Sequence, residues 1–222
     1  MYYLFVLKPI NINLCTVADP RRVKNLAMKK LPLEPENYYH IFNHANGRED
    51  FFYDKYDYQN FLNRYIKYIV PIADTFAYCL MPNHFHFFVQ IKGEGMQKLQ
   101  GVNDPRRVDP RIISYRFSHF FNSYAQSYNK KYSRKGSIFI SNFKRKAVNT
   151  EKYFIKMIHY IHSNPVNDGF TSKIQNWEFS SYKIILSDAD TFINRKMVLD
   201  YFGDKENFIF VHANPMTLQG SL

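Results

Sequence analysis

The sequence TFAYCLMPNHFHFFVQI, residues 75–91, decides the fold. Apolar and aromatic residues lie on both sides of a Met-Pro-Asn interruption at residues 81–83, a pattern typical of two buried strands joined by a turn. Because alternate residues of a strand point to the same face, His84 and His86 should share one face while Phe85 packs on the other. Two imidazoles on one face can hold a metal ion, although such a pair on its own is as often structural or incidental.

Further strands and helices flank this pair of strands. Residues 38–43 resemble a strand, and apolar residues recur at helical spacing over residues 57–70. A second helix is expected at about residues 112–128, a strand at residues 137–148 and a third helix at residues 151–164. Because strands and helices are interleaved, the economical prediction is an α+β fold with one sheet and helices packed on one face.

The chain is expected to divide into three parts. Residues 1–36 are rich in proline and are predicted to form an irregular N-terminal arm, residues 37–186 the compact domain, and residues 187–222 a C-terminal appendage. A polar stretch at about residues 93–110, which contains glycines and prolines, is interpreted as a loop inserted in the domain.

An internal repeat is the one oddity of the sequence. VADPRRV at residues 17–23 recurs as VNDPRRV at residues 102–108, and neither copy has the apolar period of a packed element. We favour one short DNA element inserted twice and translated; a chance match and a pair of basic arms for DNA are the alternatives. Both copies are predicted to lie outside the core as exposed, irregular chain.

The composition favours a nucleic-acid partner. The formal net charge is +11 and aromatic residues make up 18% of the chain, so cations can hold phosphates while rings stack on unstacked bases. Aromatic residues that fill a core and lysines that serve solubility are the alternative. The two cysteines lack disulfide or metal spacing, and the apolar start of the chain is too short to span a bilayer. We therefore expect a cytoplasmic protein, nucleoid-associated when bound to DNA, without a membrane partner.

The helix expected at residues 151–164 carries the second part of a possible site. Tyr160 and Asn164 lie one turn apart at the edge of its apolar stripe, and Lys156 lies one turn before Tyr160. Pro165 disfavours the helical conformation in the residue before it, so Asn164 is expected to end the helix. Taken alone, Tyr160 would be an ordinary tyrosine at the edge of a core.

Two motifs together are more specific than either alone. They are CLMPNHFH at residues 79–86 and YIHSNPV at residues 160–166, and at these residues the chain resembles the REP-associated tyrosine transposases, a branch of the single-tyrosine HUH transposases. The resemblance covers roughly residues 37–186. Supporting landmarks occur in order: YYH at residues 38–40, GSIF at 136–139, FKR at 143–145, and Trp177 followed by SSY at 180–182.

The resemblance implies a ferredoxin-like antiparallel sheet of the HUH endonuclease type, with the His-x-His strand at its centre. It implies that Tyr160 is the nucleophile and that His84, His86 and Asn164 hold a divalent metal ion. Imidazoles and an amide oxygen suit Mg²⁺ or Mn²⁺. The implied activity is that of a transposase-type endonuclease and strand transferase, which cleaves hairpin-forming single-stranded DNA through a 5′-phosphotyrosine, as a monomer or a homodimer.

Basic residues near the two motifs are predicted to contact DNA phosphates. The predicted DNA-binding residues are Lys156, the cluster Lys130, Lys131, Arg134 and Lys135, and the cluster Lys144, Arg145 and Lys146. Ordinary solvation of a basic surface is the alternative for both clusters.

Rival interpretations concern the activity and the nucleophile. A domesticated hairpin nucleic-acid-binding protein without cleavage activity is the rival of the enzyme, and the intact His84, His86 and Tyr160 argue against it. A structural zinc site is disfavoured because it needs four ligands, usually with Cys. Tyr124 and Tyr128, which precede a basic turn, are the competing nucleophiles.

Overall fold

A computed structural model describes residues 31–47, 49–93 and 110–214 of the protein. The two copies of the repeat and nearly all of the expected inserted loop lie outside the described residues, as do residues 1–30 of the expected arm. The predictions made for those segments therefore stay predictions.

The described chain folds around a four-stranded antiparallel sheet in the order β2-β3-β1-β4. The elements of this part are β1 (Tyr38–His44), α1 (Lys55–Tyr68), β2 (Ala73–Met81), β3 (His84–Ile91), α3 (Pro110–Lys131) and β4 (Lys144–Ala147). This βαββαβ sequence with β3 and β1 in the middle of the sheet is the ferredoxin-like arrangement, as predicted. The His-x-His strand is β3, and it is an inner strand.

Helices and short turns follow the sheet in the sequence. They are α4 (Glu151–Asn167), a 3₁₀ turn (Ile174–Asn176), α5 (Tyr182–Leu186), α6 (Arg195–Phe202) and α7 (Lys205–Ala213). Thr150 caps α4, because its side chain accepts a hydrogen bond from the backbone N–H of Tyr153.

One face of the sheet is covered by α1 and α3. Phe85 and Phe87 of β3 point to this face, where the ring of Phe61 lies 5.1 Å from Phe85 and the ring of Tyr65 stacks 4.1 Å from Phe87. Phe120 of α3 packs against the same two helix residues, which closes an apolar and aromatic core. These two helices agree with the expectation of helices packed on one face.

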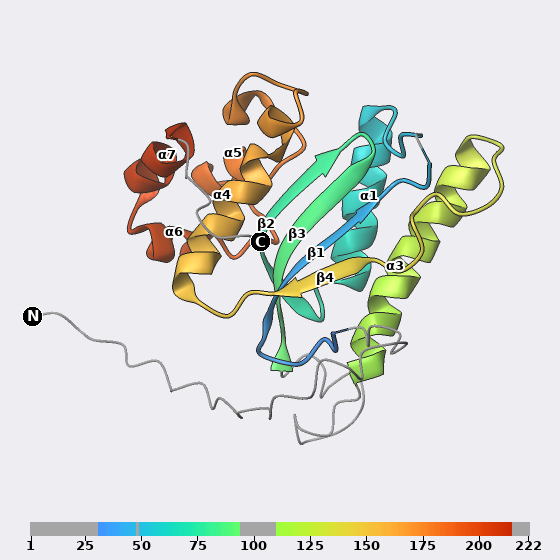
Figure 1. Ribbon diagram of the computed structural model, residues 1–222, viewed down its shortest axis with the longest axis horizontal. Coiled ribbons are helices and arrows are strands. Elements are labelled where there is room, and N and C mark those ends of the chain that lie inside the picture. Colours follow the sequence, from blue (N-terminus) through green and yellow to red (C-terminus); the bar gives the residue numbers. More distant parts are fainter. Residues whose placement is uncertain (1–30, 48, 94–109, 215–222) are drawn as a thin grey trace, which may run out of the picture. The chain divides into compact units, whose positions relative to one another are not determined.

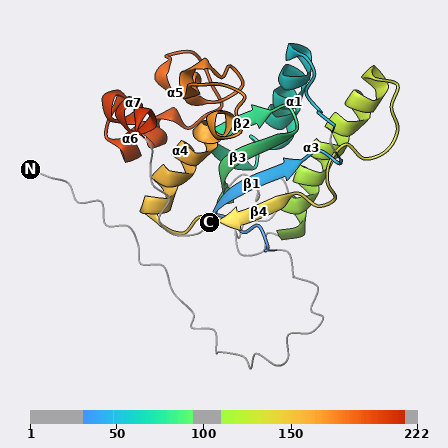
Figure 2. The same ribbon diagram turned by 45° about the horizontal axis from the view of Figure 1, so that its top comes forward.

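The third long helix, α4, lies on the opposite face, so the prediction of helices packed on one face describes α1 and α3 but not α4 (Figures 1 and 2). Phe154 of α4 packs 4.8 Å from Phe88 and 5.0 Å from Phe76, two rings on the histidine-bearing face of the sheet. The helix packs mainly on β2 and β3. The physical reason is that Phe76 and Phe88 are also apolar residues on the histidine-bearing face, so this face needs a cover as well.

Two predicted boundaries are wrong. The helix continues through Pro165 to Asn167. A proline in the last turn removes only one backbone N–H donor, and it biases the conformation of the preceding Asn164 away from the helix without excluding it. The strand predicted at residues 137–148 is confined to Lys144–Ala147, with one further bridge between Phe139 and Ala45. Asn142 has φ of 65°, a left-handed conformation that interrupts a strand.

The segment expected as a C-terminal appendage packs on the same unit as far as it is described. Ile193 forms a parallel bridge with Thr75 of β2, and the backbone N–H of Asn194 donates to the carbonyl of Thr75. Phe202 and Phe208 of α6 and α7 are buried. At the other end, Leu33 is fully buried, so residues directly before β1 also belong to this unit. Within the described residues no helix is long and apolar enough to cross a membrane.

Candidate active site

The two histidines of β3 share one face of the sheet. The rings of His84 and His86 lie 5.3 Å apart, and the two residues are only 6% and 4% exposed. An inner strand fixes both side chains, because β3 is hydrogen-bonded to β2 on one side and to β1 on the other. The prediction that the alternation of a strand places both imidazoles on one face is therefore confirmed.

His86 is held by a second histidine, His40 of β1. The Nε2 atom of His40 lies 2.7 Å from Nδ1 of His86, and the ring of Phe42 stacks 4.6 Å from that of His40. Burial lowers the pKa of His40 to about 3 and that of His86 well below its ordinary value, so both rings are neutral at pH 7. His40 therefore fixes the orientation of His86, a role of the kind that supports metal-binding histidines.

His84 has partners at both ring nitrogens. Its Nδ1 atom lies 2.7 Å from Oδ1 of Asn83, and its Nε2 atom lies 3.1 Å from Oδ2 of Asp168. The ring of His44 stacks 4.7 Å away. Burial, followed by the charge of His44, lowers the pKa of His84 to about 4, while the Asp168 carboxylate acts in the opposite direction. Neither Asp168 nor His40 was singled out as a functional residue from the sequence.

Tyr160 of α4 faces the histidines of the sheet. Its ring meets those of His86 and His40 edge-on, with centroids 5.7 and 5.8 Å away. Burial raises the pKa of the Tyr160 phenol, and the Asn164 amide, as a hydrogen-bond donor, opposes this effect. The phenol is therefore protonated at pH 7 and needs activation before it can act as a nucleophile.

Asn164 lies one turn after Tyr160 and is 6% exposed. Its Nδ2 atom donates to the backbone carbonyl of Tyr160 at 2.8 Å. The next turn ends at Asp168, whose backbone N–H donates to the carbonyl of Asn164. Tyr160, Asn164 and Asp168 are spaced four residues apart, so they lie along one edge of α4 next to the histidine-bearing face.

The side chains on this face can be compared with those that hold a metal ion in proteins. No group of three or more His, Cys, Asp or Glu side chains is arranged as a metal site within residues 31–47, 49–93 and 110–214. The chemistry of the donors nevertheless fits a divalent cation. His84 and His86 are neutral imidazoles. The amide nitrogen of Asn164 donates a hydrogen bond to the Tyr160 carbonyl, which leaves the amide oxygen as a possible ligand.

The competing tyrosines have structural roles on the other face of the sheet. The Tyr124 hydroxyl donates to the carbonyl of Phe51, and the Tyr128 hydroxyl donates to the carbonyl of Asp50 at 2.9 Å. Burial raises the pKa of both phenols. Both residues lie on α3, whereas the histidine pair faces α4.

The basic residues of β4 divide between the two faces. Lys144 pairs with Phe42 and Lys146 pairs with His40 in the antiparallel register, so both lysines lie on the histidine-bearing face. Lys144 Nζ is 5.9 Å from the ring centroid of Phe42. Arg145 points to the other face, where it donates to the hydroxyl of Ser114 at 3.0 Å. Lys144 and Lys146 are thus the cations of this cluster that lie beside the site.

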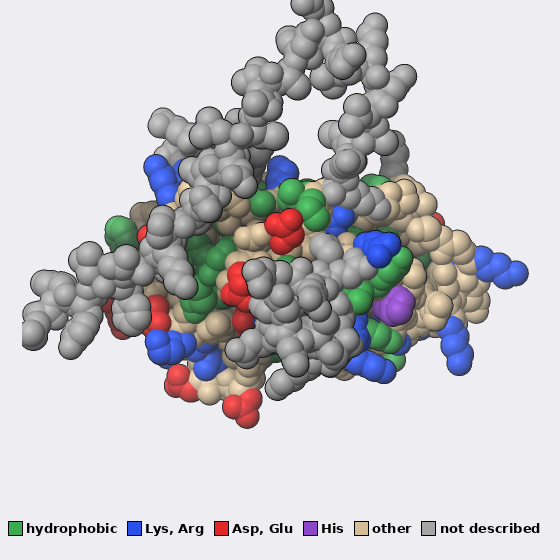
Figure 3. Space-filling model, turned by 90° about the horizontal axis from the view of Figure 1, so that it is seen from below, with side chains coloured by type: hydrophobic (Ala, Val, Ile, Leu, Met, Phe, Trp, Pro, Cys, Tyr) green, Lys and Arg blue, Asp and Glu red, His purple; other side chains and the backbone are tan. Residues whose placement is uncertain are grey.

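Lys156 is half-buried on α4, one turn before Tyr160. The remaining cluster lies at the end of α3, where Lys131 forms ion pairs with Asp54 at 2.7 Å and Asp57 at 2.8 Å, and Arg134 pairs with Glu49. Lys130 and Lys135 of that cluster are exposed. On the face drawn in Figure 3, Lys and Arg side chains are interspersed with Asp and Glu and with apolar residues.

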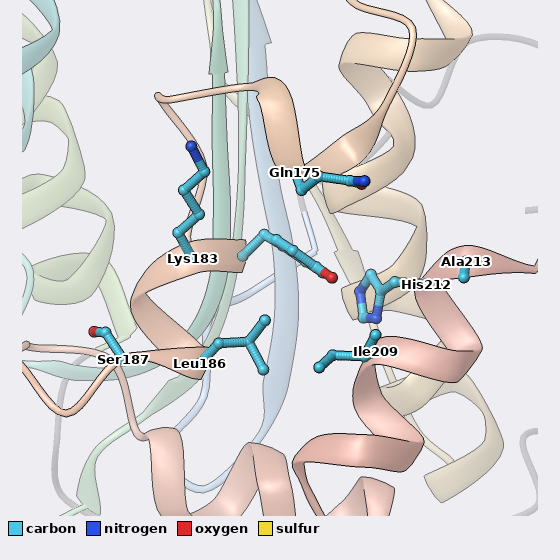
Figure 4. Close-up of a pocket in the computed structure, with 8 residues that line it drawn as sticks. Gln175, Lys183, Leu186, Ser187, Ile209, His212 and Ala213 are labelled. Atoms are coloured by element: carbon cyan, nitrogen blue, oxygen red, sulfur yellow. The ribbon is translucent and has the colours of Figure 1, made fainter.

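A second histidine cluster lies on another side of α4. His162 is fully buried, with its Nδ1 atom 2.9 Å from Nε2 of His212 and its Nε2 atom 2.8 Å from Oγ of Ser181. A pocket beside His212 is lined by side chains of α5 and α7, among them Lys183 and Ile209, and by none of the residues around Tyr160 (Figure 4). This cluster joins the C-terminal helices to α4 and takes no part in the site.

The fold and the site define a ferredoxin-like α+β protein in which a His-x-His strand faces a tyrosine carried by a helix. The structure is similar to the solved structure of a REP-associated tyrosine transposase bound to a REP hairpin, with a TM-score of 0.52. The two chains are 15% identical, and the match covers 77% of this chain and 94% of that one. At this identity the similarity shows a shared fold. No protein-family model matches the sequence, and no curated protein matches it.

Proposed function

We propose that the protein is a transposase-type endonuclease and strand transferase of the REP-associated tyrosine transposase kind. It would bind hairpin-forming single-stranded DNA and cleave it through a 5′-phosphotyrosine. The observation that carries the proposal is the position of Tyr160, whose ring lies 5.7 Å from His86 on the face shared by His84 and His86. A fold neighbour that binds a REP hairpin supports the choice of DNA substrate.

The chemistry is an in-line displacement at phosphorus. The Tyr160 phenol loses its proton and its oxygen forms the new bond to phosphorus, while the bond from phosphorus to the 3′ oxygen breaks. The 3′ oxygen takes up a proton, so the strand leaves with a free 3′-hydroxyl. The phosphodiester energy is kept in the phosphotyrosine, so attack by another 3′-hydroxyl rejoins strands. A divalent ion held by His84, His86 and Asn164 would supply positive charge next to the scissile phosphate.

His40 and Lys156 would assist without touching the bonds that change. The buried contact of 2.7 Å between His40 and His86 holds the second imidazole in one orientation, which is the condition for a fixed ligand. Lys156 lies one turn before Tyr160 on α4, and its positive charge would favour the phenolate form of the nucleophile if the two side chains meet when DNA is bound.

Metal dependence tests this function. His84→Ala and His86→Ala are each expected to abolish nicking of a labelled hairpin oligonucleotide, and the wild type is expected to require Mg²⁺ or Mn²⁺. Asn164→Ala should weaken metal binding less, because a neutral amide oxygen is a weaker ligand than an imidazole. The measurement is cleavage on denaturing gels in the presence and absence of EDTA.

Hairpin binding by the same variants distinguishes a cleaving enzyme from a domesticated hairpin-binding protein without cleavage activity. Both histidine variants should still shift a hairpin on native gels, which shows that they are folded. Full cleavage in excess EDTA would contradict the proposal. Hairpin binding without cleavage by the wild type, at any divalent ion tested, would favour the domesticated binding protein instead.

The lysines of β4 are expected to hold the phosphates nearest to Tyr160. The double variant Lys144→Gln/Lys146→Gln should bind the hairpin more weakly and lower the slope of log affinity against log salt by about 2, because two phosphate contacts are lost. The measurement is affinity by fluorescence anisotropy at several salt concentrations.

The matched control changes the net charge equally but acts at the end of α3. Lys130→Gln/Lys135→Gln, both exposed, should lower the salt slope less than the β4 variant does. An equal or larger effect of the control, with little effect at β4, would place the DNA across the α1 and α3 side of the sheet.

A further inference from the structure

We infer that Phe170 and Trp177 form a stacking platform for an unpaired base of the bound DNA strand, beside the phosphate that is cut. This inference rests on the proposed function and deepens it, because it names the part of the substrate that these two rings recognise. Phe170 is 40% exposed, and its ring lies 5.8 Å from that of the half-buried Trp177. Neighbouring rings that stay partly exposed offer the kind of surface on which an unstacked base packs.

The end of α4 fixes Phe170. The backbone N–H of Phe170 donates to the carbonyl of Pro165 at 2.8 Å, and that of Gly169 donates to the carbonyl of Val166 at 3.1 Å. These two hydrogen bonds form a Schellman motif, which needs a left-handed residue, and Gly169 has φ of 77°. An apolar residue after such a glycine often packs back on the last turn of the helix, yet Phe170 remains exposed, so the motif alone does not account for its ring.

Trp177 is fixed by the sheet. Its indole Nε1 donates to the carbonyl of Leu80 on β2 at 3.0 Å, and the backbone N–H of Leu80 donates to the carbonyl of Phe179 at 2.9 Å. The ring of Phe179 stacks 3.6 Å from that of Tyr58, which ties this segment to α1. A platform that is already held in place loses little conformational entropy when a base binds to it.

Both rings are tethered to residues next to the proposed site. Phe170 follows Asp168 by two residues, and the Asp168 carboxylate lies 3.1 Å from Nε2 of His84. Two residues of chain span at most about 7 Å. Leu80, which holds the indole, lies on β2 beside the start of β3, where His84 is located. A nucleotide that flanks the scissile phosphate is therefore close enough for its base to reach the two rings.

The charge of the segment suits a DNA strand. Residues 169–177, GFTSKIQNW, include one lysine and no acidic residue. Lys173 is exposed, and the acidic residue that follows the segment, Glu178, is paired with Lys55 at 2.5 Å. Aromatic rings next to an exposed cation are the combination that binds a base together with a neighbouring phosphate of a single strand.

The test uses the fluorescence of Trp177, which is the only tryptophan of the chain, so that its emission reports this platform. The full-length protein is titrated in EDTA, where no cleavage is expected, with two hairpin oligonucleotides that share one stem. One hairpin is blunt, and the other carries unpaired nucleotides at both ends. Because a base that stacks on an indole quenches its emission, the extended hairpin should quench Trp177 and bind more tightly than the blunt one.

Phe170→Ala should bind the extended hairpin at least about fivefold more weakly than the wild type does, because one stacked base is lost. It should bind the blunt hairpin as the wild type does, which also shows that the variant is folded. Phe170→Tyr keeps the ring and should keep both affinities. Phe210→Ala, which removes a 66% exposed phenylalanine of α7, is the matched control and should bind both hairpins like the wild type.

The outcomes separate this inference from the function on which it rests. Unchanged Trp177 emission, or equal quenching by the blunt and the extended hairpin, would overturn the inference alone, since cleavage is proposed to depend on Tyr160 and the histidines. Equal losses of affinity in Phe170→Ala and Phe210→Ala would overturn it as well. A wild-type protein that binds neither hairpin would contradict the proposed function itself.

Discussion

Tyr160→Phe is expected to bind hairpin DNA like the wild type and to form no covalent protein–DNA adduct. The substitution removes the single oxygen that attacks phosphorus and leaves the ring that packs against His40 and His86. Loss of a nucleophile should lower the cleavage rate by at least about 10³-fold. Denaturing gels with labelled DNA would measure the adduct, and native gels would measure hairpin binding.

Tyr124→Phe and Tyr128→Phe are the matched controls, since each also removes one phenolic hydroxyl. They lose hydrogen bonds to the carbonyls of Phe51 and Asp50, at a cost of about 1 kcal/mol each to the free energy of unfolding. Both should keep cleavage activity. An adduct that persists in Tyr160→Phe and disappears in either control would move the nucleophile to α3.

The second large effect concerns acid stability. We expect the free energy of unfolding to fall by several kcal/mol as the pH decreases from about 6.5 to about 4, at roughly 1.4 kcal/mol for each unit of pKa shift. Burial lowers the pKa of His40 and of His212 to about 3, and that of His86 and His162 well below the ordinary value.

The sign follows from proton binding in the two states. Above pH 6.5 the imidazoles are neutral whether the chain is folded or unfolded, so they add no pH dependence. Below pH 6.5 the unfolded chain takes up protons that the folded chain cannot bind, and the folded state loses stability until the pH reaches the folded pKa. Urea unfolding at pH 7.5, 6.0 and 5.0 would measure this loss.

A pair of variants makes the acid prediction specific. His212→Gln should lower stability at pH 7.5, because it disturbs the contact with His162, yet show a smaller loss between pH 7.5 and 5.0. The exposed His119→Gln should leave the whole profile unchanged. If the free energy of unfolding of the wild type stayed constant down to pH 5.0, the pKa values of the buried histidines would not be lowered in the folded state.

Local patterns of the sequence predicted the two halves of the site. The period of two in β3 placed His84 and His86 on one face, and the helical period placed Tyr160 beside Asn164, since both rules depend only on near neighbours. The fold class followed from the order of these elements. Tyr160 is preferred over Tyr124 and Tyr128 because Lys156 and Asn164 lie one turn before and after it and because its motif resembles that of the transposase family, and the structure places its ring against the histidines.

Contacts between distant residues could not be predicted in the same way. Asp168 is 84 positions after His84, and His40 is 46 positions before His86; both contacts depend on strand register and on the packing of α4. Which side of the sheet α4 covers also depends on tertiary packing, because the apolar residues of β3 do not determine which helix covers which face. The prediction that Asn164 ends the helix is wrong because a proline only biases the conformation of the residue before it, and this bias does not by itself end a helix.

The two edges of the sheet are protected from pairing with other chains in different ways. The edge of β2 is already occupied: Ser180 and Ile193 form bridges with Cys79 and Thr75. The edge strand β4 has four residues, and three of them are Lys or Arg, which disfavours the addition of another strand. The lysines proposed to bind DNA would therefore also act against edge-to-edge aggregation, which leaves the helical surfaces for self-assembly within the described part of the chain.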